Sequence, residues 1–162
     1  MIDTVGRTIR SRSAIATLIV ISTGVSGLAM AQESGPVSLD LTPKLQDLLL
    51  QEMQSIEQAS KNILSALIAG DDARVAELAQ QIHDSFIMEQ SMTPDDEQDL
   101  IAAVPEDFLT QDRALHELSH SLAEAARDGD RARQHAKFGA MIEACTACHT
   151  AYATDRFPHL AK

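Results

Sequence analysis

Two glycine–aspartate pairs set the strongest limits on how this 162-residue chain can fold. Gly70-Asp71 and Gly129-Asp130 each separate two long stretches rich in helix-forming residues. Glycine is a common left-handed cap at the end of a helix, and aspartate often caps the start of the next. Turns this short make the two joined helices antiparallel neighbours. The sequence therefore predicts two helical hairpins, and from them an all-α, antiparallel up-down-up-down four-helix bundle.

The spacing of apolar residues positions the first hairpin. Thr42-Pro43 predicts a helix start, because threonine can cap and proline suits the first helical position. An apolar stripe follows at steps of three and four residues: Leu45, Leu49, Met53, Ile56, Ser60, Ile63 and Leu67, widened by Leu48, Leu64 and Ile68. The next helix is expected to begin at Asp71 or Asp72, to fade at Ser91, and to carry Val75, Leu78, Ala79, Ile82, Phe86 and Met88.

The second hairpin follows a connection that is itself partly helical. Thr93-Pro94 predicts a short helix that Pro105 interrupts. A long helix is expected from Pro105 to Gly129, and the last helix from about Asp130 to about Thr154. The chain has no Trp, one Tyr and four Phe, and runs of β-branched residues are scarce, which also favours the all-α class.

The N-terminus has the pattern of a secretory signal peptide. Arg7, Arg10 and Arg12 form a basic segment, an apolar segment follows over residues 14–28, and Ala29-Met30-Ala31 matches a cleavage site. The alternative is an uncleaved membrane anchor, for which the uncharged run is barely long enough. We expect a signal peptide over residues 1–31, a flexible leader over 32–40, a single bundle domain over 41–162, and export to the periplasm.

The charge balance narrows the range of partners. The formal net charge is −11, and the predicted signal peptide contains more basic than acidic residues, so the mature chain would be more acidic still. Such a chain is a poor binder of nucleic acid or of an anionic membrane surface. Its acidity favours a basic protein partner, although it is explained more simply by solubility.

The strongest functional signal is Cys145-Thr146-Ala147-Cys148-His149, which contains both cysteines of the chain. C-x-x-C-H is the attachment pattern of c-type haem, in which the two thiols form thioethers and the histidine ligates iron. A thioredoxin-like site would need a βαβ pattern, and a zinc site would need further ligands. A disulfide between these two positions would be strained within a helix. We therefore expect one covalent haem c, with His149 as the proximal iron ligand.

Met53 is the candidate for the distal iron ligand. It lies about 15 Å along the first helix from Pro43, at 1.5 Å per residue, and His149 lies about 9 Å from the end of the last helix. If the first and last helices are antiparallel neighbours, the two side chains can lie on opposite faces of one haem. The alternative is an ordinary core methionine, since methionine is a common filler of cores.

Other metal-binding patterns are weaker. His116 and His120 have the i, i+4 spacing that can direct two imidazoles at one metal, but such pairs usually face solvent. His83, Met88 and Met92 could bind a soft metal such as copper, whereas core packing explains them more simply. No pairing of a nucleophile with a base is evident, so we expect a protein that is not an enzyme.

These features together resemble the class II cytochromes c, which include cytochrome c′, over residues 41–157. Tyr152 follows the motif as in the family, whereas Ala153 stands where arginine is usual and Arg156 is no more than a candidate substitute. The position that often carries a distal-side arginine in cytochrome c′ is Leu49 here. The first helix also resembles that of the related b-type four-helix cytochrome, in which an early methionine binds haem.

The resemblance implies a periplasmic monohaem cytochrome, and the departure at Leu49 favours electron transfer with His149 and Met53 as axial ligands. The alternative is a five-coordinate cytochrome c′-type protein that binds NO or CO. A redox protein is the expected partner, no membrane binding is expected after signal cleavage, and the resemblance leaves a homodimer open. A haem-free thiol-redox or metal-binding bundle is the third option.

Overall fold

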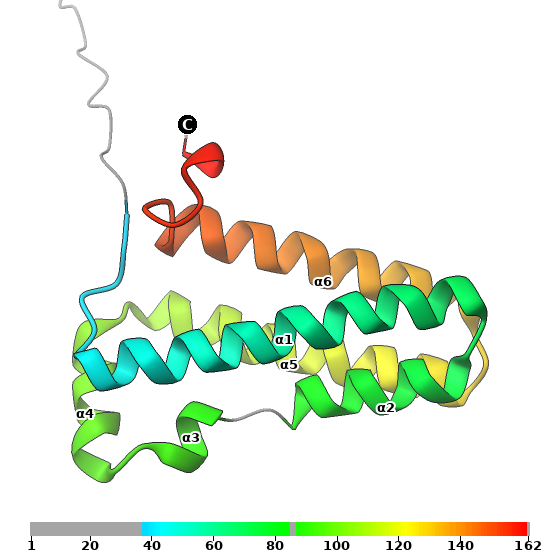
Figure 1. Ribbon diagram of the computed structural model, residues 1–162, viewed down its shortest axis with the longest axis horizontal. Coiled ribbons are helices and arrows are strands. Elements are labelled where there is room, and N and C mark those ends of the chain that lie inside the picture. Colours follow the sequence, from blue (N-terminus) through cyan, green and yellow to red (C-terminus); the bar gives the residue numbers. More distant parts are fainter. Residues whose placement is uncertain (1–36, 85–86, 162) are drawn as a thin grey trace, which may run out of the picture. The chain divides into compact units, whose positions relative to one another are not determined.

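The computed structural model describes residues 37–84 and 87–161, and this part of the chain is helical without strands. The predicted signal peptide and Phe86 lie outside the described residues. The all-α prediction is confirmed. The helices are α1 Pro43–Ala69, α2 Asp72–His83, α3 Ile87–Ser91, α4 Pro94–Ala103, α5 Glu106–Arg127 and α6 Arg131–Tyr152, followed by a 3-10 turn, η1 Pro158–Leu160 (Figure 1).

Both glycine turns are formed as the sequence predicts. Gly70 has φ 70° and Gly129 has φ 67°, the left-handed conformation that glycine adopts without a Cβ clash. Asp71 Oδ1 accepts a hydrogen bond from Arg74 N–H at 3.0 Å, and Asp130 Oδ1 accepts one from Arg133 N–H at 3.0 Å. Each aspartate therefore caps the helix that follows its glycine. The colour order in Figure 1 runs in opposite directions along α1 and α2, and along α5 and α6.

The two turns are also joined to each other. Arg131 Nη2 donates to Gly70 O at 3.2 Å, and Gln134 Nε2 donates to Asp72 Oδ1 at 3.0 Å. Gln134 is only 1% exposed, so its amide needs a partner of this kind. These bonds fasten the start of α6 to the turn of the first hairpin.

Some helix boundaries differ from the sequence prediction. The second helix was expected to continue to Ser91, but α2 ends at His83 and α3 is a separate short helix. The break allows Met88 of α3 to pack beside the start of α1, where its N–H donates to Glu52 Oε2 at 3.3 Å. The last helix ends at Tyr152 rather than near Thr154, and the Thr154 hydroxyl instead accepts a hydrogen bond from Val37 N–H at 2.7 Å.

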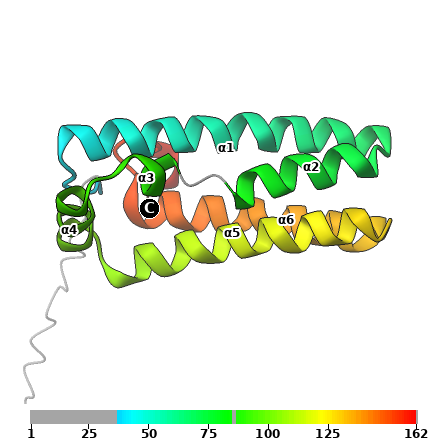
Figure 2. The same cartoon turned by 90° about the horizontal axis from the view of Figure 1, so that it is seen from below.

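The core consists of two apolar clusters. The turn-end cluster joins the second half of α1 to α2, the second half of α5 and Met141 of α6. The motif-end cluster joins the start of α1 to α3, α4 and the start of α5. Figure 2 shows α3 and α4 near one end of α1, away from the two glycine turns. Close backbone packing pairs α1 with α2, α2 with α5, and α5 with α6, whereas α1 and α6 are not such a pair in the described chain.

The buried face of α1 is rotated from the predicted stripe. Its buried residues are Leu45, Leu48, Glu52, Ile56, Ala59, Ile63 and Ala66. Leu49, Met53, Ser60 and Leu67 are only half-buried. Leu64 and Ile68, which were expected to widen the stripe, are 50% and 80% exposed. The predicted face was centred to one side of the true one because Glu52 and two alanines occupy buried positions.

Candidate functional site

The C-x-x-C-H motif lies in the last two turns of α6. Cys145, Cys148 and His149 have i, i+3 and i+4 spacing, which places them on one side of the helix. Cys145 packs against the turn-end cluster, and Cys148 packs with Tyr152 against the motif-end cluster. The motif therefore spans the junction between the two halves of the core.

Both cysteines are unpaired and half-buried. Burial raises the pKa of the Cys145 thiol. Burial, helped by the negative charge of Asp112 and by Cys145, raises the pKa of Cys148 to about 11. Thiol-redox centres need a lowered pKa that favours thiolate. The environment therefore keeps these thiols protonated and does not favour a thiol-redox site.

His149 has an environment that suits a metal ligand. Burial lowers the pKa of its imidazole, which favours the neutral form that can donate a lone pair to iron. Its ring stacks on Phe157, with ring centroids 4.2 Å apart and an interplanar angle of 7°. No hydrogen bond joins the ring to another residue that the structure describes, so its nitrogens stay available for ligation.

Met53 lies on α1 and packs against the turn-end cluster, as Cys145 does from α6. Leu49, one turn earlier, packs against the motif-end cluster that Cys148 and Tyr152 also contact. The structure thus brings Met53 and Leu49 against the same two clusters as the motif. His149 contacts Phe157 instead, on the segment that follows α6.

Two carboxyl groups near the motif, the buried Glu52 and the half-buried Asp112, were not predicted from the sequence. Glu52 is 5% exposed, and its burial raises the pKa of its carboxyl group although Met88 N–H donates to it. Burial also raises the pKa of Asp112, against the opposing effect of His116. The burial of Glu52 could have been inferred from its position on the helix, because it lies four residues after Leu48 and four before Ile56, and both of these are buried.

The histidines of α2 and α5 pair with backbone rather than forming a metal centre. His83 Nδ1 lies 3.1 Å from His116 O, and His116 Nδ1 lies 3.1 Å from His83 O. A carbonyl can only accept, so both Nδ1 atoms carry the proton. His116 is 3% exposed, so the expectation that it faces solvent with His120 is wrong. Within the described chain, no three His, Cys, Asp or Glu side chains gather around a possible metal position.

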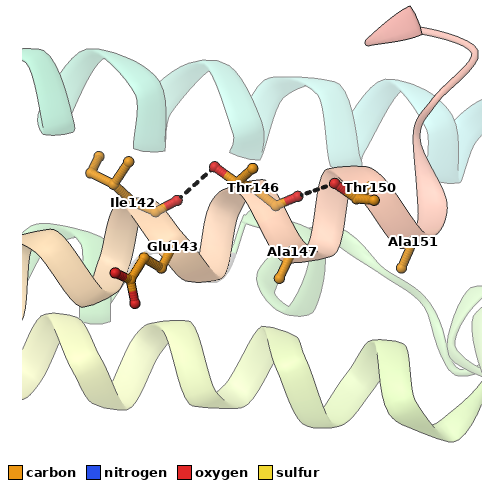
Figure 3. A pocket seen from close by; sticks show the side chains of 6 residues that line it. All are labelled: Ile142, Glu143, Thr146, Ala147, Thr150 and Ala151. Atoms are coloured by element: carbon orange, nitrogen blue, oxygen red, sulfur yellow. Dashed lines mark hydrogen bonds between the residues drawn. The ribbon is translucent and has the colours of Figure 1, made fainter. Parts of the chain in front are cut away.

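A shallow hollow of about 500 Å³ lies along another side of α6. Figure 3 shows its lining, which comes from α6 alone: Ile142, Glu143, Thr146, Ala147, Thr150 and Ala151. The Thr146 hydroxyl donates to Ile142 O at 2.9 Å, and the Thr150 hydroxyl donates to Thr146 O at 2.8 Å. The hollow includes neither motif cysteine nor His149, but Thr146 and Ala147, which lie between the two cysteines, are part of its lining.

Comparison with protein families decides what this motif belongs to. The family model described as Cytochrome C′ matches residues 44–153, from the start of α1 to the residue after α6. The chain belongs to the cytochrome c′ family. Its bundle is that of a c-type cytochrome, a class that carries covalent haem. No curated protein and no solved structure matches the chain.

The residues present fit a covalently attached haem. Two unpaired thiols, and an imidazole whose pKa is lowered by burial, lie on one side of one helix and are the groups that such attachment requires. Most of the surface of α6 is not covered by other helices and is open to contact with a haem. Only Gln134 and Met141 are buried among its 22 residues. By comparison, eight residues are buried in α5, which has the same length.

Proposed function

We propose that this protein is a periplasmic electron-transfer cytochrome that holds one haem through Cys145 and Cys148. In this proposal His149 is the proximal iron ligand and Met53 the distal one. The long helices form an up-down-up-down bundle that carries the haem on its last helix. The bound haem supplies a reversible ferric–ferrous couple, and the protein acts as a carrier rather than as an enzyme.

The observation that carries the proposal is the placement of the motif. Cys145 packs against the turn-end cluster and Cys148 against the motif-end cluster, and His149 follows them on the same side of α6. This chain's residues would anchor the haem edge, exclude water through the motif-end cluster, and orient one imidazole. Met53 supports the distal assignment, because it packs against the same cluster as Cys145.

The proposal also covers export of the protein to the periplasm and the kind of partner that it meets there. The predicted signal peptide would direct export and would then be removed, and no helix in the described part of the chain could cross a membrane. The net charge of −11 favours a basic redox protein as partner and disfavours nucleic acid. Association into a homodimer is compatible with the proposal but is not required by it.

A second function is favoured by one observation, the position of Leu49. Its side chain packs against the motif-end cluster with Cys148 and Tyr152, where an apolar group could lie over iron without binding it. In that arrangement the iron would be five-coordinate and open to NO or CO. The two functions differ only in whether Met53 binds iron.

Optical spectra of the haem-loaded protein separate the two functions. If Met53 binds iron, the ferric protein should show a weak band at the red end of the spectrum, which Met53→Ala should abolish with a change to high spin. Met92→Ala is the matched control, because Met92 is also half-buried but packs against the motif-end cluster. A high-spin parent spectrum that shifts with CO would establish the second function instead. If His149→Ala left the spectrum unchanged, both would be wrong.

A further inference from the structure

The proximal side of the candidate site has a feature that lies beyond the matched family region. The family match ends at residue 153, and Phe157 lies four residues further on. Its ring is parallel to that of His149 within 7°, at a centroid distance of 4.2 Å. Phe157 is 41% exposed, so it is not a core residue held in place by general packing.

The segment around Phe157 is fastened by backbone hydrogen bonds. We call residues 153–160 the strap. At its start, Ala153 N–H donates to His149 O at 3.0 Å, and Phe157 N–H donates back to Ala153 O at 3.0 Å. At its end, Leu160 N–H donates to Phe157 O at 2.9 Å. These bonds fix the backbone of Phe157 relative to that of His149.

A second attachment joins the strap to the chain before α1. Val37 N–H donates to the Thr154 hydroxyl at 2.7 Å, and Asp155 N–H donates to Val37 O at 3.3 Å. Thr154 is only 5% exposed, and its buried hydroxyl is satisfied by the hydrogen bond from Val37. The strap is therefore held from two directions, which restricts where the Phe157 side chain can lie.

The stacking geometry is compatible with iron binding by His149. An imidazole nitrogen donates its lone pair in the plane of the ring, so the metal approaches the ring edge. Phe157 covers a ring face and leaves the edges open. A stacked partner of this kind opposes rotation of the imidazole about its bond to Cβ and keeps water from that face. Stacked aromatic pairs are favourable beyond the surface area that they bury, so the contact can hold the ring in this orientation.

We propose that Phe157, held by the strap, is a positioning residue that fixes the ring orientation of the iron ligand His149. The inference rests on the proposed function only in requiring that His149 binds iron, whichever distal arrangement applies. Orienting partners of ligating histidines are usually hydrogen-bond acceptors, but here the orienting contact is a ring face. The neighbouring Arg156, the candidate substitute for the family arginine, is exposed and makes no side-chain hydrogen bond to a residue that the structure describes.

The test is to replace Phe157 in the full-length, haem-loaded protein and to record ferric electron paramagnetic resonance spectra and haem-methyl proton shifts. Both report how an axial imidazole is oriented over the haem. Phe157→Ala should broaden the resonance signals and change the spread of the methyl shifts, while covalent haem content and helix content stay at the parent level. Phe157→Tyr, which keeps the ring, should restore the parent spectra.

Two further variants make the result decisive. Thr154→Val removes the hydroxyl that binds Val37 and should shift the spectra in the same direction as Phe157→Ala, by a smaller amount. Ile68→Ala is the control, because Ile68 is 80% exposed at the end of α1, beside the Gly70 turn. Parent-like spectra for Phe157→Ala would overturn the inference while leaving the proposed function intact. A parent spectrum that His149→Ala does not alter would instead remove the proposed function.

Discussion

At the turn end of the bundle α1, α2, α5 and α6 are packed tightly, whereas at the motif end α1 and α5 pack more loosely against α3 and α4. In the turn-end cluster Ile63, Val75, Ala79, Leu122 and Ala123 are all 0% exposed. In the motif-end cluster Leu45 is the one residue at 0%, and the other buried members retain 6–9% exposure. The two helices that reach both ends, α1 and α5, therefore belong to a well-buried core at the turn end and to a less completely buried one at the motif end.

The buried polar groups at the two ends also differ in how well they are satisfied by partners. At the turn end, the buried amide of Gln134 is satisfied by Asp72, and Arg131 bonds to Gly70 O. Toward the motif end, burial raises the pKa of the carboxyl groups of Glu52 and Asp112, and it outweighs the opposing effect of the nearby His116. The difference suggests that the turn end supplies stability and that the motif end depends on the attached haem.

The largest expected effect comes from preventing haem attachment. Replacing Cys145 and Cys148 together with serine should abolish covalent haem, which denaturing extraction followed by a spectrum would measure. Amide hydrogen exchange should then accelerate strongly at the start of α1, in α4 and at the end of α6. Exchange around Leu122 should change least, because the turn-end cluster is closed without the motif. Equal loss of protection at both ends would contradict the comparison.

Matched leucine truncations should give the next largest effect. Leu122→Ala removes a side chain that is 0% exposed and should lower the free energy of unfolding by about 4 kcal/mol. Leu100→Ala removes one that is 8% exposed at the motif end and should cost about 2 kcal/mol, since its surroundings can relax or admit water. Denaturant titration of the haem-loaded variants measures both. A larger cost for Leu100→Ala would show that the motif end is the tighter one.

Features that depend only on neighbouring residues in the chain could be predicted from the sequence. The glycine turns need a left-handed residue followed by a capping aspartate, and the start of α1 needs Thr42 and Pro43, so these were predicted correctly. The cytochrome family was also predicted correctly, because C-x-x-C-H is a local and specific pattern.

Features that depend on tertiary contacts were missed. Glu52 is buried, although a carboxylate at that position is expected on the surface. The break between α2 and α3 depends on Met88 packing against α1, which no local pattern indicates. The contact of Phe157 with His149 exists only after residues 153–160 fold back along α6, so no local pattern indicates it.

The two turn glycines offer a finer comparison within the tight end. Gly70→Ala and Gly129→Ala should each cost roughly 1 kcal/mol, because both residues have positive φ. Gly70→Ala should cost a few tenths of a kcal/mol more. A Cβ at Gly70 would lie 3.2 Å from Arg131 Nη2, whereas a Cβ at Gly129 would meet nothing within 4 Å. Thermal unfolding of the two variants side by side measures the difference, and equal midpoints would mean that Arg131 moves aside freely.

The smallest expected effect is an opposite response of the two ends to pH. The hydrogen bond from Gln134, with a smaller contribution from Arg131, lowers the pKa of Asp72. A lowered pKa contributes stability above the ordinary value, and that contribution is lost as the pH falls. Burial raises the pKa of Asp112, so its contribution is present below the ordinary value of 3.8 and is lost as the pH rises through the raised pKa.

Two isosteric variants separate these contributions. Asp72→Asn should flatten the loss of unfolding free energy on the acid side, and Asp112→Asn should flatten the loss that sets in as the pH rises above 3.8. Denaturant titrations of the parent and both variants across this range measure the slopes. The Asp72 effect should be slight, because its carboxyl group is close to solvent. If Asp112→Asn instead steepened the loss as the pH rises, the Asp112 carboxylate would be stabilised by its neighbours, and the motif end would be as well neutralised as the turn end.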